Sequence, residues 1–362
     1  MNVMGQHSPR TAAGRPEMSF TVYRTDPIKD PRWGEFISRH PNASIFHSPQ
    51  WLCALQRTYS FQPIVFTTSP PGYPLSNGIV FASLSSWMMG KRLVSMPFSD
   101  FCEPLVNNPD ELAGILDGVC RIAPDVKYVE LRPTSDILVR SAAFAPVQQF
   151  YVHSIDLKPS LGELLAACDK RCIQQRIKRA EREQLTYKEG RSEADLASFY
   201  TLMILTRQRH QLPPQPFEWF RNLLNAVHDD LTIHLVSKGD RSIAGLLTLK
   251  FGATLYCKYS CSDHDYCNLA GGQLVFWNAI CSAKAAGLSR FDFGRTEKDN
   301  TGLITFRLRW GAKQREIQYW RNPPLPIATD TGWKMTVAKE VFSHLPGPLL
   351  QAAGRLLYRH FA

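Results

Sequence analysis

The amino-acid sequence predicts an α/β (α+β) fold in which mixed, twisted sheets are flanked by helices. Two observations predict it. Alternating strand patterns are separated by helix patterns that begin at recognisable caps. In addition, a strand, helices, three strands, a helix and closing strands follow one another in that order twice along the 362-residue chain. The repetition indicates a duplicated α/β unit, and the alternative that the order recurs by chance stays open.

The first half is predicted to begin with a strand, two helices and three further strands. The predicted strands are 20–24, 61–67, 78–85, 92–96, 126–131 and 147–155, and the predicted helices are 30–39, 49–57 and 109–122. Ser48 and Pro49 form an N-cap followed by proline at the first helical position. Asn108 with Glu111 three residues later forms a capping-box pattern that begins the third helix.

The second half repeats this order after a long helix. The predicted helices are 161–183, 194–208, 217–227, 272–286 and 302–309, and the predicted strands are 185–188, 231–237, 243–251, 254–261, 290–293 and 316–320. Ser192, with Asp195 three residues on, caps the helix at 194–208.

These elements predict a leader at 1–18, an N-terminal domain at 19–156, a C-terminal domain at 157–327 and a helical tail at 328–362. The leader has no apolar core and is expected to be disordered. In the tail, apolar residues recur at helical spacing, which predicts an amphipathic helix. This helix either docks on the body or lies on a membrane surface, and we favour docking.

Composition restricts the partners more than the function. The net charge of +10 and the pI near 9.2 favour anionic partners such as nucleotide phosphates, tRNA or an anionic membrane face. The sequence shows neither a secretory signal nor a long apolar run, so we expect a cytoplasmic protein, with peripheral contact to the inner membrane face left open. Cys257 and Cys261 with His264 and Cys267 resemble a zinc set, but four residues along a strand span ~13 Å, so no metal is expected.

Two neighbouring segments carry the strongest chemical signal. A strand pattern runs into Asp292-Phe-Gly-Arg295, and a helix containing Arg307 and Arg309 follows. This order is expected to gather one carboxylate and three guanidiniums near a strand end, where open α/β sheets hold their ligands. Guanidiniums suit phosphate or carboxylate ligands. A surface ion-pair patch is the alternative interpretation.

The strand at 254–261 has a polar face. Strict alternation places Tyr256, Lys258 and Ser260 on one side and Cys257, Tyr259 and Cys261 on the other. Because a polar face on a central strand is costly to bury, we expect it to border a cleft, with Tyr256 and Lys258 as substrate contacts. Asp100 and Glu103 are both candidates for a general base, and the sequence does not choose between them. Arg207, at a helix end, is a candidate partner for an acidic substrate group.

Two further segments are suited to phosphate. The stretch Asn268-Leu-Ala-Gly271-Gly272 precedes a helix, where free backbone N–H groups and the helix dipole favour an anion. The segment 170–182 holds six basic residues against Glu181 alone, a strong positive face for tRNA, coenzyme phosphates or lipid headgroups. The alternative for 268–272 is an ordinary helix start without a ligand. The alternative for 170–182 is a basic helix that is solvated and has no partner.

Several motifs together resemble the FemAB-like group of the GNAT superfamily, which includes acetyltransferases of bacterial exopolysaccharide operons. The motifs are Asp292-Phe-Gly-Arg295, Gly302-Leu, Phe306-x-x-x-Trp310-Gly311, Tyr319, Pro97-Phe-Ser-Asp100, Glu130-Leu-Arg132, Arg176-Ile-Lys-Arg179-Ala180, Thr206-Arg207 and Leu212-Pro213. The similarity covers roughly residues 20 to 325. It implies two tandem GNAT-like domains and transfer of an acyl or aminoacyl group to an amine or hydroxyl.

The resemblance, joined to the residue patterns, gives the predicted site. Its catalytic residues are Asp100, Tyr256 and Asp292; its substrate-binding residues are Arg207, Lys258, Arg295, Arg307 and Trp310; its phosphate-binding residues are Asn268, Gly271 and Gly272. The family often has Phe-Lys where this chain has Phe306-Arg307, which weakens a proton-transfer role there but not anion binding.

The predicted reaction is acetyl or other acyl transfer from an acyl-CoA, with no permanently bound cofactor. The acceptor is a sugar-linked or lipid-linked precursor of the envelope or of an exopolysaccharide, and peripheral membrane contact through the basic helix and the tail is expected. One alternative is a Fem-type aminoacyltransferase that takes an amino acid from aminoacyl-tRNA to a peptidoglycan precursor. Another is a non-catalytic scaffold with the same fold, since a fold does not fix activity.

Overall fold

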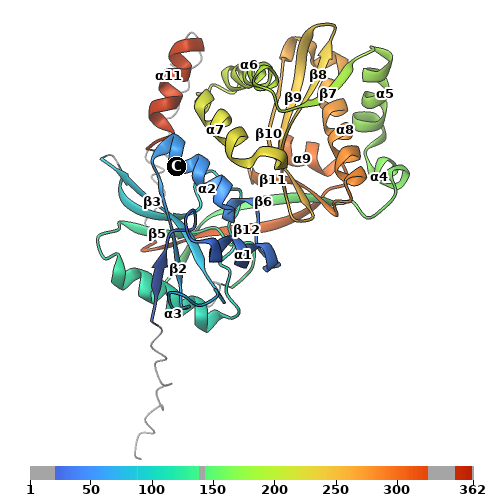
Figure 1. Ribbon diagram of the computed structural model, residues 1–362. Helices are drawn as coiled ribbons and strands as arrows, with labels where there is room; N and C mark the ends of the chain where they lie inside the picture. Colours follow the sequence, from blue (N-terminus) through green and yellow to red (C-terminus); the bar gives the residue numbers. More distant parts are fainter. Residues whose placement is uncertain (1–20, 88, 138–142, 325–346, 361–362) are drawn as a thin grey trace, which may run out of the picture.

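The computed structural model describes residues 21–87, 89–137, 143–324 and 347–360 (Figure 1). The strands of the first half are β1 (Tyr23–Thr25), β2 (Gln62–Thr67), β3 (Ile79–Ser86), β4 (Gly90–Ser95), β5 (Tyr128–Leu131) and β6 (Ala145–Asp156). Those of the second half are β7 (Thr186–Gly190), β8 (Leu231–Lys238), β9 (Arg241–Phe251), β10 (Thr254–Ser262), β11 (Arg290–Glu297) and β12 (Lys313–Asn322). In the described residues they form one sheet in the order β1-β2-β3-β4-β5-β12-β6-β11-β10-β9-β8-β7.

The helices flank this sheet. They are α1 (Pro31–Arg39), α2 (Pro49–Tyr59), α3 (Pro109–Ile122), α4 (Leu161–Ala167), α5 (Gln175–Arg182), α6 (Glu193–Arg209), α7 (Phe217–Val227), α8 (Gly271–Ala285), α9 (Thr301–Leu308) and α11 (Gly347–Leu357). The predicted caps are confirmed: the side chain of Ser48 accepts the Trp51 N–H at 3.1 Å, and that of Asn108 accepts the Glu111 N–H at 2.9 Å.

The two halves have the same plan, which confirms the predicted fold of tandem units. In the first half β1 to β4 are antiparallel neighbours and β5 pairs parallel to β4. In the second half β7 to β10 are antiparallel neighbours and β11 pairs parallel to β10. Each parallel pair is joined through a helix, α3 or α8, as a parallel connection requires.

The halves exchange their last strands. β6, from the first half, pairs with β11 of the second half, and β12, from the second half, pairs with β5 of the first. β6 and β12 also pair with each other, along β12 from Lys313 to Arg321. The sheet is therefore continuous across the expected boundary at 156 and 157, and the domain bounds themselves stay a prediction.

One apolar core joins the halves on one face of the sheet. Helices α1 and α2 pack there beside α6 and α7, and the Trp51 and Trp219 rings meet edge to face at 5.1 Å. On the other face, α4, α5 and α8 cover a second core around Phe276 and Phe291, and α3 covers a third around Ile115 (Figure 1). The sheet is thus covered on both faces, and the shared first core fixes how the two halves sit together.

The long helix expected at 161–183 is wrong. The chain leaves α4 after Ala167, and Asp169 caps a new start by accepting the Cys172 N–H at 2.6 Å. A π-helical turn, Lys170–Gln174, then leads into α5. The Asp169 N–H donates to the Arg309 carbonyl at 2.7 Å, so a contact distant in sequence fixes the break.

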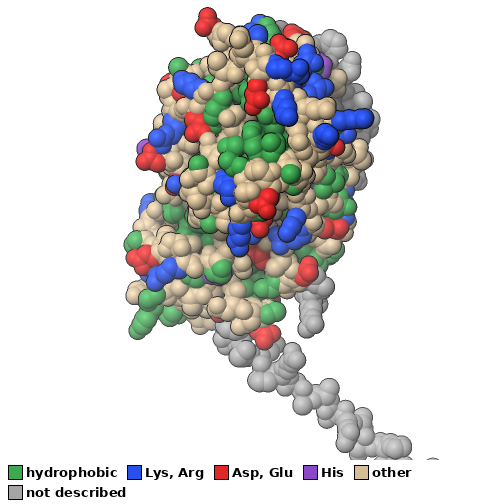
Figure 2. All heavy atoms as spheres, turned by 90° about the vertical axis from the view of Figure 1, so that its right-hand side faces the viewer, with side chains coloured by type: hydrophobic (Ala, Val, Ile, Leu, Met, Phe, Trp, Pro, Cys, Tyr) green, Lys and Arg blue, Asp and Glu red, His purple; other side chains and the backbone are tan. Residues whose placement is uncertain are grey.

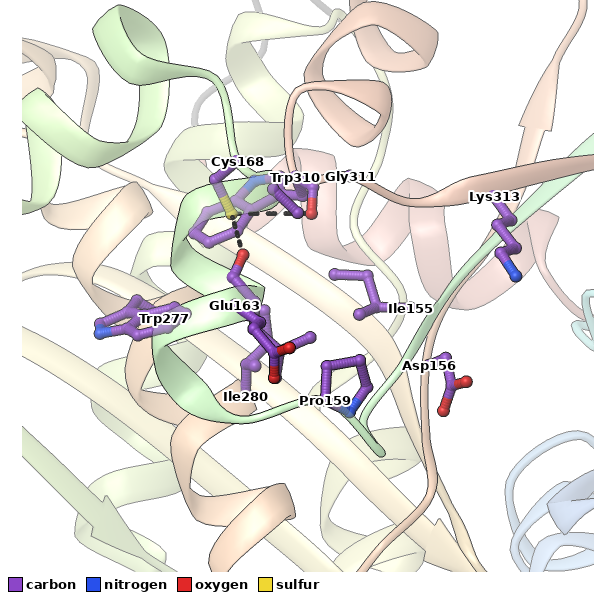
Figure 3. Close-up of a pocket in the computed structure, with 12 residues that line it drawn as sticks. Ile155, Asp156, Pro159, Glu163, Cys168, Trp277, Ile280, Trp310, Gly311 and Lys313 are labelled. Carbon is purple, nitrogen blue, oxygen red and sulfur yellow. Dashed lines mark hydrogen bonds between the residues drawn. The ribbon is translucent and has the colours of Figure 1, made fainter.

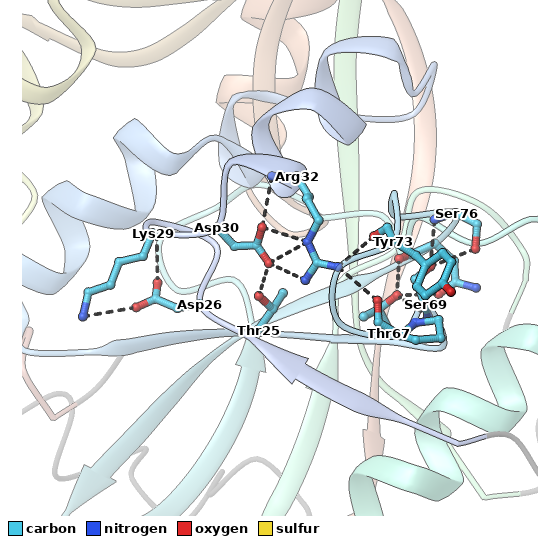
Figure 4. A network of polar contacts seen from close by, with 11 residues as sticks. Thr25, Asp26, Lys29, Asp30, Arg32, Thr67, Ser69, Tyr73 and Ser76 are labelled. Carbon is cyan, nitrogen blue, oxygen red and sulfur yellow. Dashed lines mark hydrogen bonds and ion pairs between the residues drawn. The ribbon is translucent and has the colours of Figure 1, made fainter.

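A polar network ties the start of α1 to a turn of the first half (Figure 4). Asp30 caps α1 and forms a two-atom ion pair with Arg32, whose Nη2 lies 2.6 Å from the carboxylate. The same guanidinium donates to the carbonyls of Pro70 at 3.1 Å and Tyr73 at 2.7 Å. The hydrogen bonds from Arg32, together with one from Thr25, lower the pKa of Asp30 to about 2.

The described part of the tail docks on the body, as favoured from the sequence. Gly354 lies against Pro214, whose carbonyl would be 2.0 Å from an added Cβ, and the Tyr358 hydroxyl donates to the Pro213 carbonyl at 3.1 Å. The predicted leader at 1–18 and the tail residues 328–346, 361 and 362 lie outside the described residues. Within the ranges that the structure describes, no helix has the length and apolarity needed to cross a membrane.

Candidate active site

The parallel strands β10 and β11 separate in the middle of the sheet. They pair over three residues only, and the last pair is Tyr256 with Asp292; β10 then continues along β9, and β11 along β6. Asp292 pairs in turn with Ser154 of β6, which pairs with Lys313 of β12. Because paired residues of neighbouring strands share a face, these four polar residues form one row across the sheet.

A cavity of about 420 Å³ lies over this row, at the seam between the halves. Its size is in the range of small-molecule sites. The first half contributes 41–44, Phe101, Thr134 and 152–154, and the second half contributes Tyr256, Arg290, Asp292 and 313–315. The cavity therefore brings together two of the predicted catalytic residues, Tyr256 and Asp292, in a space that needs both halves.

Asp292 is the acid at the base of the cavity. Its side chain is 6% exposed, and one carboxylate oxygen accepts the Gly294 N–H at 2.6 Å. Burial raises the pKa of Asp292 to about 6, although this hydrogen bond and Arg307 oppose the rise. A carboxylate with such a pKa can act as a general base close to neutral pH.

Gly294 allows the two halves to approach each other here. Its φ is +75°, a region that other residues rarely adopt, and an added Cβ would lie 3.0 Å from the Asp100 carboxylate. The register of β11 shifts between Asp292 and Arg295, so Gly294 is the centre of a bulge. Glycine is thus required both by the bulge and by the carboxylate beside it.

Asp100 and Lys258 form a buried ion pair next to this bulge. The Lys258 Nζ lies 2.9 Å from Asp100 Oδ2 and is surrounded by the rings of Phe46, Trp51 and Tyr259 at 5.2 to 5.7 Å. Burial lowers the pKa of Lys258, while Asp100 acts in the opposite direction. The pair joins the first half to β10.

The other candidate base, Glu103, is used elsewhere. Its carboxylate accepts the N–H and hydroxyl of Thr134, at 2.5 and 2.8 Å, and both donors of Ser135. Of the two acids only Asp100 therefore reaches the cluster around Gly294, and its catalytic role stays a prediction.

The strict alternation expected along 254–261 is wrong beyond Lys258. The register of β10 shifts between Cys257 and Tyr259, which marks a bulge. As a result Tyr259 and Cys261 pack in the same core as Tyr256, while Cys257 packs in the core on the other face. A single extra residue therefore reverses the facing of the rest of the strand.

Two of the three arginines turn inward. Arg307 is 8% exposed and donates from Nη1 to the Gly294 carbonyl at 2.8 Å and to Thr296. Arg295 lies 4.2 Å over the Phe150 ring and donates to the Tyr319 hydroxyl at 3.2 Å. Arg309 is exposed at the end of α9, so its predicted place beside them is wrong.

Arg207 and Trp310 lie outside the cavity over Asp292. Arg207 is half-buried at the end of α6, close enough to Tyr259 to affect its ionisation. Trp310 is 1% exposed and lines a separate cavity of about 310 Å³ between α4 and α8 (Figure 3). There its carbonyl accepts from the Cys168 thiol at 3.6 Å. Substrate binding by Arg207 and by Trp310 stays a prediction.

The predicted phosphate loop begins α8. Ala270, with φ +63°, precedes the helix, and no side chain caps the first turn. An added Cβ on Gly271 would lie 3.1 Å from Ile243, whereas Gly272 has no atom within 4 Å and faces open space. Asn268 is exposed. In the first turn the N–H groups of Gln273 and Leu274 donate to the Ala270 carbonyl, at 3.1 and 3.2 Å, so the N–H groups of Gly271 and Gly272 are the candidates for binding an anion.

The sequence did not indicate the mouth of the cavity. Arg290, Lys313 and Arg315 are exposed there, and Ser154 and His153 contribute from β6. Their convergence depends on the pairing of β6 with β11 and β12, which no local pattern reveals. The alternation of Lys313 and Arg315 at a strand start was the one available signal, because it places both on one face.

Comparison with known proteins agrees with this architecture. The family model of the acetyltransferase (GNAT) domain matches residues 169–300. FemX has a similar structure, with a TM-score of 0.65 at 15% identity over 80% of this chain and 95% of its own. No curated protein matches by sequence.

Two other solved structures are similar over most of their length. The C-terminal domain of a putative lysylphosphatidylglycerol synthetase from Agrobacterium fabrum gives a TM-score of 0.54 at 13% identity, over 87% of this chain and 96% of its own. A tandem GNAT protein from the clavulanic acid biosynthesis pathway gives 0.52 at 8%, over 83% and 98%. At such identities the likeness establishes the fold. The family match identifies an acetyltransferase (GNAT) domain at residues 169–300, and the chain as a whole shares the fold of FemX and of the tandem GNAT protein.

Proposed function

We propose that the protein moves an acyl group, acetyl in the simplest case, from an acyl-CoA to an amine or hydroxyl. The acceptor is a sugar-linked or lipid-linked precursor of the cell envelope or of an exopolysaccharide, a class suggested by the family resemblance. The observation that most supports the proposal is the seam cavity, which holds Tyr256 and the buried Asp292 where β10 and β11 separate.

In the proposed reaction the acceptor atom attacks the thioester carbonyl and passes its proton to Asp292. A C–N or C–O bond forms and the C–S bond breaks; the Tyr256 hydroxyl is the candidate hydrogen-bond donor to the departing thiolate, which takes up the acceptor's proton from Asp292. Burial raises the pKa of Tyr256, which keeps it protonated before the thiolate leaves. Lys258 and Arg307 do not line the cavity, but they are buried next to it, beside Asp100 and Gly294, and supply positive charge close to the developing oxyanion.

The phosphates of the acyl-CoA are proposed to bind the first turn of α8. Gly272 offers a direct test, because a side chain there meets no atom within 4 Å. We expect Gly272→Glu to weaken acetyl-CoA binding at least ~10-fold by calorimetry, since a carboxylate replaces the phosphate at the positive helix end. The matched control is Gly162→Glu in the first turn of α4, where the nearest atom is 4.0 Å away. Equal affinity in both variants contradicts the donor site.

The alternative, aminoacyl transfer from aminoacyl-tRNA, is favoured by one surface. Most basic side chains of 170–182 are exposed on the side of the molecule that bears α4, α5 and α8, where Figure 2 shows Lys and Arg around an apolar patch. Arg179 is paired with Glu183 at 3.8 Å, and Glu181 is the one acid within 170–182. Tight tRNA binding with a steep salt dependence, and no binding of acetyl-CoA, would replace our proposal with this one.

We place the reaction at the inner membrane face, through a surface built by the β3–β4 turn and α11. Trp87 is 86% exposed in that turn, and Leu349 and Leu356 are 55% and 65% exposed on the outer side of α11. The Trp87 ring lies 6.3 Å from the ring of His360, so the turn and the helix adjoin. Exposed Arg359 complements an anionic leaflet.

Vesicle sedimentation tests this location. The protein is expected to pellet with phosphatidylglycerol vesicles and not with phosphatidylcholine vesicles. Trp87→Ser with Leu356→Ser should abolish pelleting, whereas Tyr73→Ser, which removes an aromatic side chain that is 66% exposed elsewhere, should not. Pelleting that survives the double substitution contradicts the assignment of the surface.

A further inference from the structure

Three cations surround the mouth of the seam cavity on one face of the sheet. Arg290 stands two residues before Asp292 on β11, Lys313 lies in the same row as Asp292, and Arg315 stands two residues beyond Lys313 on β12. Since side chains two apart on a strand share a face, all three are on the side of the cavity. We call Arg290, Lys313 and Arg315 the basic rim.

The basic rim is not neutralised by the protein. Within the described part of the chain no ion pair includes any of the three. Glu316, next to Arg315, pairs instead with Lys298 at 2.9 Å. Asp156 is paired in register with Arg290 and, like Lys313, lines the other cavity, beside α4, but it forms no ion pair with either cation.

The remaining titratable groups of the wall add no negative charge. Burial lowers the pKa of His153 and raises that of Tyr256, so both are neutral at pH 7. Asp292 is then the only acid among the lining residues, against three cations. The cavity therefore favours an anionic ligand and disfavours a cationic one.

We propose that the basic rim binds a phosphate or carboxylate group of the acyl acceptor, so that the substrate is an anionic amine or alcohol. This inference rests on the proposed acyl transfer at Asp292, and it specifies the class of acceptor. The anion sits at the mouth, and the amine or hydroxyl of the same molecule points to the buried carboxylate.

The strand geometry sets how compact the acceptor is. Alternate residues of a strand are about 7 Å apart and neighbouring strands about 5 Å, so the backbone of Asp292 lies about 7 Å from Arg290 and about 10 Å from Lys313. Arginine and lysine side chains reach inward over this distance. The spacing suits a molecule in which one sugar ring separates the anion from the reacting atom, and the cavity of about 420 Å³ accommodates it.

Calorimetry with inorganic pyrophosphate at low salt tests the basic rim directly. The protein is titrated with coenzyme A present at saturation and again in the Gly272→Glu background, so that the first turn of α8 is blocked in two ways. The triple variant R290Q/K313Q/R315Q is expected to bind pyrophosphate about 10-fold or more weakly, because charge-assisted contacts are lost. The control R309Q/K170Q/K178Q removes three exposed cations elsewhere and should stay within about twofold of the parent.

A second pair of probes identifies the acceptor chemistry. Glucosamine 1-phosphate should bind more tightly than glucosamine to the parent, and the difference should vanish in the triple variant. Succinate in place of pyrophosphate shows whether the basic rim accepts carboxylates as well. The charge-preserving variant R290K/R315K should retain binding, and unchanged thermal unfolding of the triple variant shows that it is folded.

The outcomes separate this inference from the proposed function. If the parent does not bind pyrophosphate, or if the triple variant binds it equally well, the basic rim is not an anion site. This conclusion does not depend on which acyl donor the protein uses. Loss of acetyl-CoA binding in the parent instead removes the proposed donor, while rim-dependent pyrophosphate binding would still stand.

Discussion

Replacing Asp292 by asparagine should make the protein more stable at pH 8 and remove its activity. The substitution keeps the size of the side chain and an oxygen for the Gly294 N–H, now 2.6 Å away. It removes only the negative charge that the 6% exposed carboxylate has to carry when ionised. The proposed base is thereby lost, so acyl transfer should fall at least ~100-fold.

The size and sign of the stability change follow from the pKa. The pKa of Asp292 rises from 3.8 to about 6 on folding. One pKa unit corresponds to about 1.4 kcal/mol, so burying the ionised carboxyl costs at most about 3 kcal/mol. Because the folded state holds the proton more tightly, stability falls between pH 3.8 and about 6 and the full cost applies above that. The uncharged amide of the variant carries none of this cost.

Urea unfolding at pH 4 and pH 8 measures the effect. The gain of Asp292→Asn over the parent should reach about 2 to 3 kcal/mol at pH 8 and nearly vanish at pH 4. Asp156→Asn, an exposed acid on the neighbouring strand β6, should show no such difference. A gain that is the same at both pH values, or a loss at pH 8, would refute the assignment of a buried, ionisable base.

Three further changes have defined outcomes. Lys258→Met should lower the free energy of unfolding in urea by about 3 kcal/mol, because it leaves Asp100 charged and unpaired. Asp100→Asn in the same background should recover part of that loss. If it recovers none, the ion pair does not stabilise the protein. Asp30→Asn should lower the free energy of unfolding in urea by about 1 kcal/mol at pH 7, after allowance for solvent screening. Because folding lowers the pKa of Asp30 from 3.8 to about 2, this difference between parent and variant should disappear as the pH falls through 2. Gly294→Ala should lower the melting temperature more than Gly287→Ala, because both have φ near +75° but only Gly294 has a neighbour within 4 Å, the carboxylate of Asp100; equal shifts would show that the approach is unimportant.

Local signals predicted most of the fold. Helices α3 and α7 begin and end at the predicted residues, because caps and the apolar period are encoded within a few residues. The break before α5 was missed because it depends on the Arg309 carbonyl, 140 residues away from Asp169 in the sequence. The bulge at Lys258 was missed because its cause is the splitting of two strands, and a single inserted residue leaves no mark in the alternation itself.

The sequence predicted only part of the site, because local motifs indicate some of its residues and distant strand pairing places the others. Tyr256 and Asp292 were found because each sits in a short motif on a strand, and the structure brings them to one cavity. Arg309 was misplaced because helix phase, not proximity in sequence, decides which arginine of α9 turns inward. The basic rim depends on which strands pair across the halves, and strand pairing between distant segments has no local signature.

The exchange of β6 and β12 also bears on how the chain is made. While the second half is still being synthesised, β5 has one edge with no partner, since its neighbour β12 begins only at Lys313. An open edge of this kind invites pairing with another chain. Neither half produced alone would complete its sheet, so co-expressed fragments split at 156 should recover solubility only together, and the nascent chain depends on rapid completion or on a chaperone until β12 emerges.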